Sequence, residues 1–524
     1  MNRRRFLQHS LRLSALAALA QAFPGYAAER SAAYPFTLGV ASGSPRHDSV
    51  VLWTRLLPDI LHAYALPAVA YKVRWEVAED EAFRRICAKG ESHALPELAH
   101  SVHVDVTGLQ PERWYWYRFL LGDAVSPPAR TRTAPAPEAQ PSSLRLAVAS
   151  CQHWEFGEYA AHRHIAAAHP DLVAFLGDYI YEWGPYDLRH PPKPRPRQHD
   201  CLSLDDYRRR YAQYKSDPLL QLAHQVAPWI VTWDDHEVCN DYGNDRDEWL
   251  SPDFLQRRAA AYQAFYEHMP VRPPAPGADA FAHLRIYERY DWGRLARFHV
   301  LDDRQYRSHQ ACPAPGRGGS NSVSDAECGE RLDPSRTLLG HEQEKWLEHG
   351  LASSGARWNV LAQQTLLAQA SQTAALQQGE GKFWTDGWDG YPAARQRLFY
   401  AIQQHQPANP VVISGDVHSF YAANLKRDFY SKASAANPVL ATEFCGTSIT
   451  SSSRPQALTE RYVAQNPHIK FGRSDVRGYM LLDISQKQIL TRFMALDDVR
   501  RADSGISTLA SFVVEDGKAG VLSA

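Results

Sequence analysis

Apolar residues in the later part of the chain fall into short runs, each closed by polar residues. Residues 172–176 are continuously apolar and uncharged, which predicts a strand buried on both faces, and Gly177 and Asp178 follow directly. Three further apolar runs, the first interrupted by Arg145, cover residues 144–149, 229–233 and 411–415. Ligands collect at the carboxyl ends of strands in open α/β sheets, so the residues that close these runs are candidates for one shared site.

Helical and hairpin patterns separate these runs. Residues 156–169 are predicted to be helical, and Ser203 begins a capping-box pattern for a helix ending near His224. A third helix is predicted to begin at residues 251–253, with one face formed by Leu255, Ala259, Tyr262 and Tyr266. Residues 284–301 and 479–495 are each predicted to form a hairpin, so we expect mixed rather than purely parallel sheets.

Residues 34–125 show a different pattern, with apolar residues at alternate positions in several short segments. This predicts a small β-sandwich of the immunoglobulin or fibronectin type. The proline-rich residues 126–143 are predicted to be a linker, and residues 144–524 a catalytic domain. The basic, proline-rich segment 185–197 is interpreted as either a solvated insertion or a flap near the site.

The composition is that of an ordinary globular protein, with 524 residues, 44% hydrophobic residues and a formal net charge of −1. Near-neutrality argues against a nucleic-acid partner, which needs a clustered basic surface. Residues 1–28 combine Arg3-Arg4-Arg5, a short apolar run and small residues, which resembles a twin-arginine signal peptide. We therefore expect export by the twin-arginine machinery to the periplasm or beyond, without stable membrane insertion.

The chain contains seven cysteines, so at least one thiol stays free. Cys312 and Cys328 flank a loop rich in Gly, Ser and Pro, and we expect a disulfide there. Closing a loop of that length stabilises the folded state by about 3 kcal/mol in the chain-entropy model.

The residues that close the four runs have the chemistry of a dinuclear metal site. Asp178 offers two oxygens, which two metals about 3.5–4 Å apart can share, and Tyr181 is near enough to reach the same ion. A phenolate favours ferric iron over zinc. Cys151 is either a ligand or a nucleophile; the arginine that a cysteine-phosphatase loop needs is missing, which favours a ligand. Asp416 and His418 share one face of an extended segment and could reach both metals.

The densest polar cluster is Asp234-Asp235-His236-Glu237. Such groups repel one another unless a cation is present, so Asp235 is expected to be a ligand; a salt-bridged helix cap is the alternative. We expect His236 to face the substrate oxygen and either Glu237 or Asp234 to orient it. Arg304 would either hold a phosphate oxygen or form a structural ion pair. A further polar-aromatic group is expected either to line the pocket or to cap the helix after Pro392: Asp386, Trp388, Asp389 and Tyr391.

Taken together and in order, these motifs resemble the PhoD-type alkaline phosphatases. The motifs concerned are Gly-Asp178-Tyr-Ile-Tyr181-Glu, Trp-Asp-Asp-His-Glu, Leu-Asp-Asp-Arg-Gln-Tyr-Arg, Asp-Gly-Trp-Asp-Gly-Tyr and Gly-Asp416-Val-His418. The resemblance implies an α/β fold with a metallophosphoesterase-like core of two packed mixed sheets flanked by helices. It also implies phosphomonoesterase or phosphodiesterase activity and a ferric iron with calcium.

Residue by residue, the resemblance implies that Cys151, Asp178, Tyr181 and His418 bind Fe³⁺, with Asp178 bridging. Asp235 and Asp416 would serve Ca²⁺, with Asn240 as the alternative to Asp235, and His236 would lie beside the leaving group. The expected mechanism is in-line attack on phosphorus by a metal-bound hydroxide. Two alternatives stay open: a diesterase acting on phospholipid headgroups or teichoic-acid-like polymers, and a non-catalytic exported protein that binds calcium and glycan.

Overall fold

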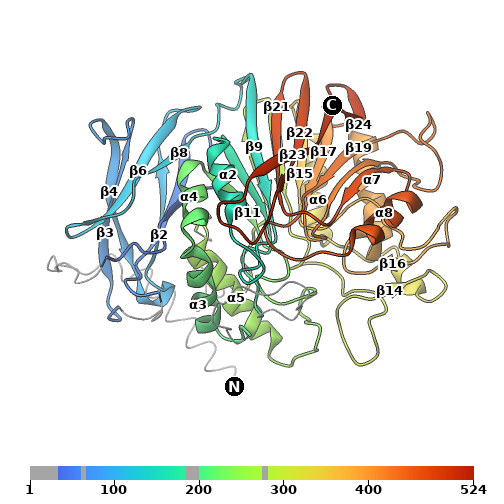
Figure 1. Ribbon diagram of the computed structural model, residues 1–524, viewed down its shortest axis with the longest axis horizontal. Coiled ribbons are helices and arrows are strands. Elements are labelled where there is room, and N and C mark those ends of the chain that lie inside the picture. Colours follow the sequence, from blue (N-terminus) through green and yellow to red (C-terminus); the bar gives the residue numbers. More distant parts are fainter. Residues whose placement is uncertain (1–33, 61–65, 184–199, 274–280) are drawn as a thin grey trace. The chain divides into compact units, whose positions relative to one another are not determined.

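The computed structural model describes residues 34–60, 66–183, 200–273 and 281–524, which fall into two compact units (Figure 1). The first unit comprises the chain up to Thr133 together with Cys201–Pro228 and Leu255–Arg285. The second comprises Ala134–Asp200, Trp229–Phe254 and Ile286–Ala524. The predicted signal peptide and the segment 185–197 lie outside the described residues, and the predicted domain boundaries stay a prediction.

Two groups of antiparallel strands enclose the core of the first unit. One group contains β1 (Val40–Gly43), β2 (Ser49–Arg55) and β5 (Ser101–Thr107). The other contains β3 (Tyr71–Ala78), β4 (Ile86–Ala94), β6 (Trp114–Leu121), β7 (Ala124–Val125) and β8 (Ala129–Arg132). Alternate residues of β2, β5, β3 and β6 bury their side chains in one cluster, as the period-two pattern predicted. Within the predicted linker, Ala129–Arg132 form β8, which pairs with β6.

The helices of the first unit are α3 (Leu204–Lys215), α4 (Pro218–Val226) and most of α5 (Phe254–His268). The capping box at Ser203 is confirmed. The single helix predicted to end near His224 is instead two helices, because Asp217 caps a new helix whose first residue is Pro218. On α5, Tyr262 and Tyr266 are buried as predicted, whereas Leu255 is 53% exposed.

The first sheet of the second unit has the strand order β24-β23-β22-β21-β9-β10-β11. The neighbouring pairs β9–β10 and β10–β11 are parallel, and the other neighbouring pairs are antiparallel. The bounds are β9 (Ser143–Ala149), β10 (Leu172–Leu176), β11 (Trp229–Thr232), β21 (Gly478–Ser485), β22 (Gln488–Leu496), β23 (Ile506–Glu515) and β24 (Lys518–Ser523). The hairpin predicted within 479–495 is confirmed as β21–β22.

The second sheet has the order β12-β13-β15-β17-β19-β18-β20, with β13, β15, β17 and β19 parallel. The bounds are β12 (Glu288–Trp292), β13 (Ala296–Val300), β15 (Trp358–Ala362), β17 (Pro410–Ser414), β18 (Phe420–Leu425), β19 (Ala441–Cys445) and β20 (Ile469–Arg473). The hairpin predicted within 284–301 is β12–β13. A separate small ribbon pairs β14 (Ser322–Val323) with β16 (Phe383–Trp384).

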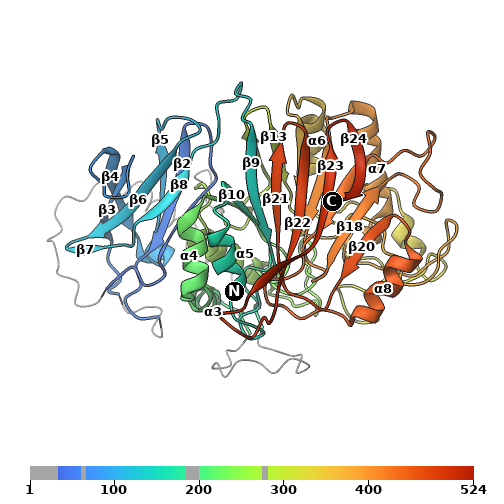
Figure 2. The ribbon, with the colours of Figure 1, turned by 45° about the horizontal axis from the view of Figure 1, so that its top comes forward.

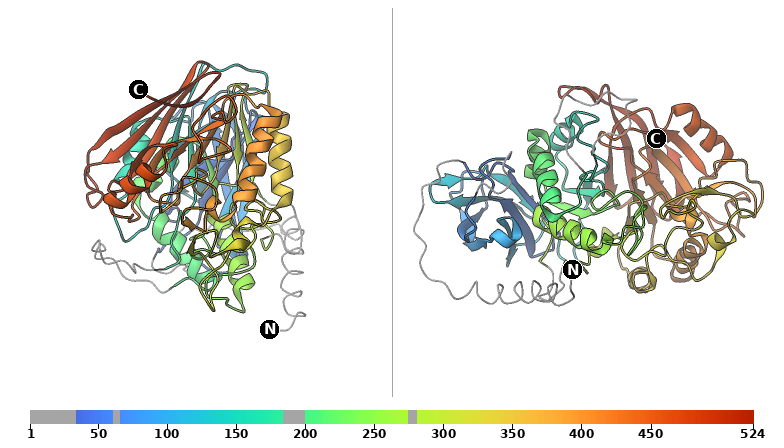
Figure 3. Two further views of the ribbon diagram at one scale, coloured as in Figure 1. Left: turned by 90° about the vertical axis from the view of Figure 1, so that its right-hand side faces the viewer. Right: turned by 90° about the horizontal axis from the view of Figure 1, so that it is seen from below.

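The two sheets of the second unit pack face to face, and helices cover their outer faces (Figures 2 and 3). Buried apolar side chains of both sheets meet in one cluster, in which Phe420 stacks on Phe493 at 4.5 Å between ring centroids. Helices α6 (His341–Ala352) and α7 (Pro392–His405) bury Leu347, Leu351 and Phe399 against the second sheet. Helix α2 (Ala160–Ala167) contacts β21, and α8 (Gln456–Gln465) contacts β20. Short 3₁₀ turns complete the described elements: η1 (Pro96–Leu98), η2 (Gly329–Leu332) and η3 (Trp388–Gly390).

Cys312 and Cys328 form a disulfide, as predicted, and the other five cysteines are free thiols. Among the described residues, the helices are too short or too polar for any of them to cross a lipid bilayer.

Candidate metal centre

The turns that follow the parallel strands of the second unit hold four side chains on strained backbone. Cys151 follows β9, Asp178 follows β10, and Asp416 and His418 follow β17; their φ angles are 59°, 56°, 61° and 53°. Non-glycine residues rarely adopt this left-handed region, and each instance costs about 1–3 kcal/mol. Such strain persists where the surrounding structure enforces it, most often at functional sites. All four residues belong to the ligand set predicted from sequence.

Glycine makes one of these turns possible. Gly177, between β10 and Asp178, has φ of +102°, and an added Cβ would lie 2.4 Å from the Cβ of Asp234. The chain after β10 and the chain after β11 can therefore approach each other only because this position has no side chain.

The predicted iron ligands lie together. One ligand atom each of Cys151, Asp178 and His418 lie within 4.8 Å of one another. The Tyr181 hydroxyl donates to Oδ2 of Asp178 at 2.8 Å and lies 3.1 Å from Nε2 of His418. A thiol, a phenol, a carboxylate and an imidazole from three strand ends thus converge on one point.

Two serines fix the orientation of this group. Nδ1 of His418 donates to the carbonyl of Ser452 at 2.6 Å, so in the neutral ring the lone pair of Nε2 faces the centre. The Ser451 hydroxyl donates to the Tyr181 oxygen at 2.7 Å. Both serines come from a loop after β19, where no ligand was predicted from the sequence.

A second group of acids adjoins the first. Asp178, Asp235 and His236 form one set with ligand atoms within 4.8 Å, and Asp234, Asp235 and Asp416 form another. Oδ2 of Asp234 and Oδ1 of Asp235 are buried without a hydrogen-bond partner. Buried polar atoms are nearly always satisfied, so these two oxygens could hold a cation, although Oδ1 of Asp235 also lies 3.7 Å from the Arg304 guanidinium.

Electrostatics support the same conclusion. Burial raises the pKa values of Asp234, Asp235 and Asp416; Arg304 opposes the rise, and neighbouring carboxylates add to it. Burial and the charge of Asp178 also raise the pKa values of Cys151 and Tyr181. These groups resist ionisation together, and a bound cation is what would allow them to be charged at the same time.

His236 is oriented by a residue that the sequence did not single out. Its Nδ1 lies 2.7 Å from Oε2 of Glu182, whose Oε1 accepts from the backbone N–H of Asn240 at 2.7 Å. The prediction that Glu237 or Asp234 orients this ring is therefore wrong. Burial disfavours the imidazolium, but the charges of Glu182, Asp235 and Asp178 outweigh it and raise the pKa of His236 well above its usual value.

Glu237 instead organises the backbone. Its Oε2 accepts from the N–H of Asp178 at 3.0 Å and of Asp234 at 2.8 Å, and its Oε1 accepts from the N–H of Tyr179 at 2.6 Å. Burial and the charge of Asp178 raise the pKa of Glu237 to about 8, against the effect of these hydrogen bonds. This carboxyl therefore joins the turns after β10 and β11 through their backbone N–H groups.

Arg304 forms the structural ion pair that the sequence left open as one reading. Its side chain is fully buried and contacts Asp234, Asp386 at 2.6 Å and Asp416 at 3.1 Å. Arg307 shares Asp386 with it at 2.9 Å. A guanidinium so enclosed has no donor directed at a substrate, so its predicted contact with a phosphate oxygen is not supported.

A cavity of about 690 Å³ opens onto these groups. The predicted site residues that line it are Asp178, Asp235, His236, Asn240, Asp416 and His418. Asp386, Trp388 and Asp389 line it as well, so the prediction that this polar-aromatic group lines the pocket is confirmed for these three residues. The Tyr391 hydroxyl instead donates to the Ser308 carbonyl. The side-chain amide of Asn240 donates to Glu248 at 3.2 Å.

Comparison with known proteins identifies the family. The model of the PhoD-like phosphatase family matches residues 146–493, and the model of its N-terminal domain matches residues 19–135. The chain is 44% identical to alkaline phosphatase D of Bacillus subtilis (strain 168) over 537 residues, covering 99% of this chain and 88% of that protein. The chain belongs to the PhoD-like phosphatase family.

A solved structure agrees with this family assignment. A structure described as that of PhoD matches with a TM-score of 0.87 and 44% identity, over 96% of this chain and 93% of that one. The mixed α/β fold with several sheets and the assignment as a hydrolase of phosphoric esters, both expected from the sequence, are thereby confirmed.

Sequence reasoning missed four residues of this PhoD-like phosphatase site: Glu182, Ser451, Ser452 and Arg454. Arg454 lines the cavity, with its guanidinium 5.2 Å from the ring centroid of Tyr462. Among the described residues that line this cavity, Arg454 is the only arginine or lysine. Glu182 lies in the motif that carried Asp178 and Tyr181, and its carboxylate one position beyond the tyrosine was the one available signal.

Proposed function

We propose that this phosphatase is an exported, metal-dependent enzyme that uses Fe³⁺ and Ca²⁺ to hydrolyse phosphomonoesters, phosphodiesters or both. The observation that carries the proposal is the convergence of Cys151, Asp178, Tyr181 and His418 on strained turns. The orphaned oxygens of Asp234 and Asp235 beside them support a second cation.

The donor sets fit the two metals differently. A thiolate, a phenolate and an imidazole suit iron, whereas the hard carboxylate oxygens of Asp235 and Asp416 suit calcium, and Asn240 is the alternative calcium ligand. Asp178 belongs both to the group with Cys151 and His418 and to the group with Asp235, so it would contribute to holding both ions. When bound, the cations supply Lewis acidity that activates water and neutralises charge on the phosphoryl oxygens.

The protein's own groups position the substrate and its leaving group. Glu182 holds the ring of His236, which packs between Tyr181 and Trp183 with centroid distances of 4.2 and 4.7 Å. We assign His236 the donation of a proton to the leaving oxygen, because it lines the cavity and Glu182 holds its ring in place. Arg454, rather than the enclosed Arg304, is the cation available to a substrate phosphoryl oxygen.

The proposal extends to fold type and location. The two face-to-face mixed sheets fit a metallophosphoesterase-like core, and the strands of the first unit that share one core fit an immunoglobulin- or fibronectin-like β-sandwich. The basic and apolar pattern of residues 1–28 fits a twin-arginine signal and therefore a periplasmic or secreted enzyme.

Metal analysis of the purified protein, with hydrolysis measured before and after chelation, tests this proposal. Cys151→Ala should lose iron, visible charge-transfer absorption and activity together. Cys201→Ala is the matched control, because both thiols are 1% exposed and Cys201 lies in the first unit. An active, iron-free, colourless wild-type enzyme, or a Cys151→Ala variant with unchanged iron, would overturn the assignment. Relative rates on simple mono- and diesters then decide the substrate class.

A further inference from the structure

A second polar cleft of about 720 Å³ lies in the second unit, and its lining residues are all different from those of the metal pocket. Segment 368–372 contributes to both. Ala368, Ala370 and Gln372 line the metal pocket, whereas Gln369 lines the second cleft. The segment is therefore a shared wall between two cavities that have no lining residue in common.

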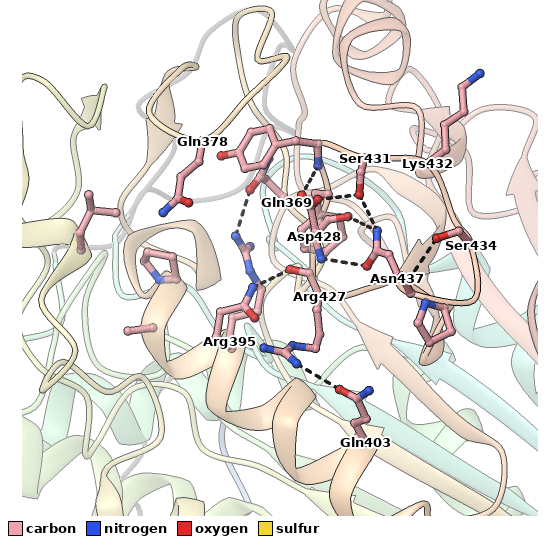
Figure 4. Close-up of a pocket in the computed structure, with 18 of the residues that line it drawn as sticks. Gln369, Gln378, Arg395, Gln403, Arg427, Asp428, Ser431, Lys432, Ser434 and Asn437 are labelled. Carbon is pink, nitrogen blue, oxygen red and sulfur yellow. Dashed lines mark hydrogen bonds between the residues drawn. The ribbon is translucent and has the colours of Figure 1, made fainter.

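One wall of the cleft is a loop that its own hydrogen bonds hold in place (Figure 4). The Asn437 amide donates to the carbonyl of Asp428 at 2.7 Å and to the Ser431 hydroxyl at 3.0 Å, and its oxygen accepts from the N–H of Asp428. The Asp428 carboxylate accepts from the N–H of Tyr430 and the hydroxyl of Ser431. The Lys426 ammonium also donates to the carbonyl of Asp428, at 2.8 Å. The wall is therefore preorganised, which reduces the ordering cost of binding.

Helix α7 fixes the most prominent cation of this wall. Gln396 donates to the carbonyl of Arg427 at 2.6 Å, and the Arg427 guanidinium donates to the oxygen of Gln403 at 3.2 Å. Gln396 and Gln403 are seven positions apart and so lie on one face of the helix. Figure 4 shows the Arg427 side chain extended toward Gln403 along the cleft.

The cleft carries an excess of positive charge. Arg331 and Arg395 are neutralised by ion pairs with Asp325 and with Asp389. Neither Arg427 nor Lys432 forms an ion pair within the described parts of the chain, although both line the cleft. These two cations exceed the single remaining carboxylate, that of Asp428, so the cleft favours an anion.

The rest of the lining suits hydroxyl groups rather than an aromatic or apolar ligand. Four glutamines line the cleft, Gln369, Gln378, Gln396 and Gln403, together with the hydroxyls of Ser431 and Ser434. Phe429 is only 7% exposed, because its ring packs against Phe399 and His468. Tyr430, the other aromatic residue that lines the cleft, is half-buried. The amides and hydroxyls of the lining can both donate to and accept from sugar hydroxyls.

We propose that this cleft is a binding site for an anionic carbohydrate, a sugar carrying a sulfate, carboxylate or phosphate group. Arg427 and Lys432 supply the positive charge that attracts the anionic group, and the glutamines and serines bind the hydroxyls. Its volume is within the range of small-molecule sites, about 300–1,000 Å³. Binding at this cleft does not depend on hydrolysis, so it can be tested separately from the proposed catalytic function.

Calorimetric titration of the full chain with glucose 6-sulfate tests the proposal, because a sulfate ester is not a phosphatase substrate. Wild-type protein should bind it, and the double variant Arg427→Gln/Lys432→Gln should bind it at least about tenfold more weakly, through loss of two charge-assisted contacts. Arg500→Gln, which changes an exposed arginine paired with Asp498, should bind as wild type does. Asp178→Asn, in the metal pocket, should also retain binding.

Three further arms separate the sources of affinity. Glucuronate and glucose 6-phosphonate should bind like the sulfate, whereas glucose alone and inorganic sulfate alone should each bind at least tenfold more weakly. If glucose bound as tightly as glucose 6-sulfate, the anionic group would not contribute to recognition. If inorganic sulfate bound as tightly as glucose 6-sulfate, the sugar would not contribute. Absence of binding to wild type, or equal binding by the Arg427/Lys432 double variant, would overturn the site itself. In each variant, hydrolysis of a small phosphate ester reports separately on the catalytic proposal.

Discussion

Replacing Glu237 by glutamine changes one atom at the junction of the two turns that carry Asp178 and Asp234. The carboxylate accepts three backbone N–H groups, two on Oε2 and one on Oε1. An amide has a single acceptor oxygen. Its best orientation places that oxygen at Oε2 and leaves the N–H of Tyr179 facing an NH₂ group.

The cost follows from this geometry. A buried donor without a partner costs about 1–3 kcal/mol, and two hydrogen bonds that lose their charged acceptor weaken by about 1 kcal/mol each. We therefore expect Glu237→Gln to destabilise the protein by about 3–5 kcal/mol. Because the loss loosens the turn that carries Asp178, iron affinity and kcat/KM should each fall by about 10- to 100-fold.

Chemical unfolding, iron content and kcat/KM are the measurements, made above pH 8, where the carboxyl of Glu237 is ionised, with Glu267→Gln as the control. Glu267 is an equally buried carboxyl of the first unit that accepts from the Arg208 guanidinium and the Gln263 side-chain amide. The control should lose stability but retain iron. Wild-type iron content and activity in Glu237→Gln would contradict this prediction. That result would mean that Glu237 is protonated in the working enzyme, because glutamine resembles the neutral carboxyl.

Glu182→Gln removes the charge that holds His236 and should lower kcat about 10- to 100-fold while iron content is unchanged; a parallel loss of iron would contradict the separation of these roles. Arg304→Met leaves buried carboxylates without their cation and should cost about 3–5 kcal/mol in chemical unfolding, with Arg304→Lys less affected. Burial lowers the pKa of Lys215 to about 7, from 10.5. The unfolded chain therefore binds the extra proton between these pH values, and stability should rise with pH from 7 to 10.5; Lys215→Met should abolish that part of the rise.

The strand ends were predictable because a buried parallel strand has a simple signature. The uncharged run before Gly177 and the runs before Cys151 and Asp416 located three turns of the site, and β10 has the predicted bounds. The left-handed backbone at these turns was not predictable, because aspartate, cysteine and histidine have no strong preference for it. The geometry there is imposed by contacts across the sheet.

Side-chain partners were harder to predict than strand ends. Glu182 and Glu237 both lie within motifs that the sequence selected, but only three-dimensional structure shows that the first contacts His236 and the second contacts backbone amides. Arg304 was open to two readings because an arginine after a strand suits a substrate or an ion pair equally. The burial of Arg304 among aspartates favours the ion pair. Burial depends on the whole fold rather than on the residues adjacent in the sequence.

The charges of the centre indicate how many cations it can hold. Six aspartates make up its acidic groups, namely Asp178, Asp234, Asp235, Asp241, Asp386 and Asp416, and Arg304 and Arg307 contribute two positive charges among them. This leaves four negative charges in a largely buried volume, and ionised Cys151 and Tyr181 would add two more. One divalent cation would leave most of that charge uncompensated, whereas a trivalent and a divalent cation together leave the centre within about one charge of neutral. Buried charge is tolerated only when it is compensated, so the proposed Fe³⁺ and Ca²⁺ match the charge of the site as well as the chemistry of its donors.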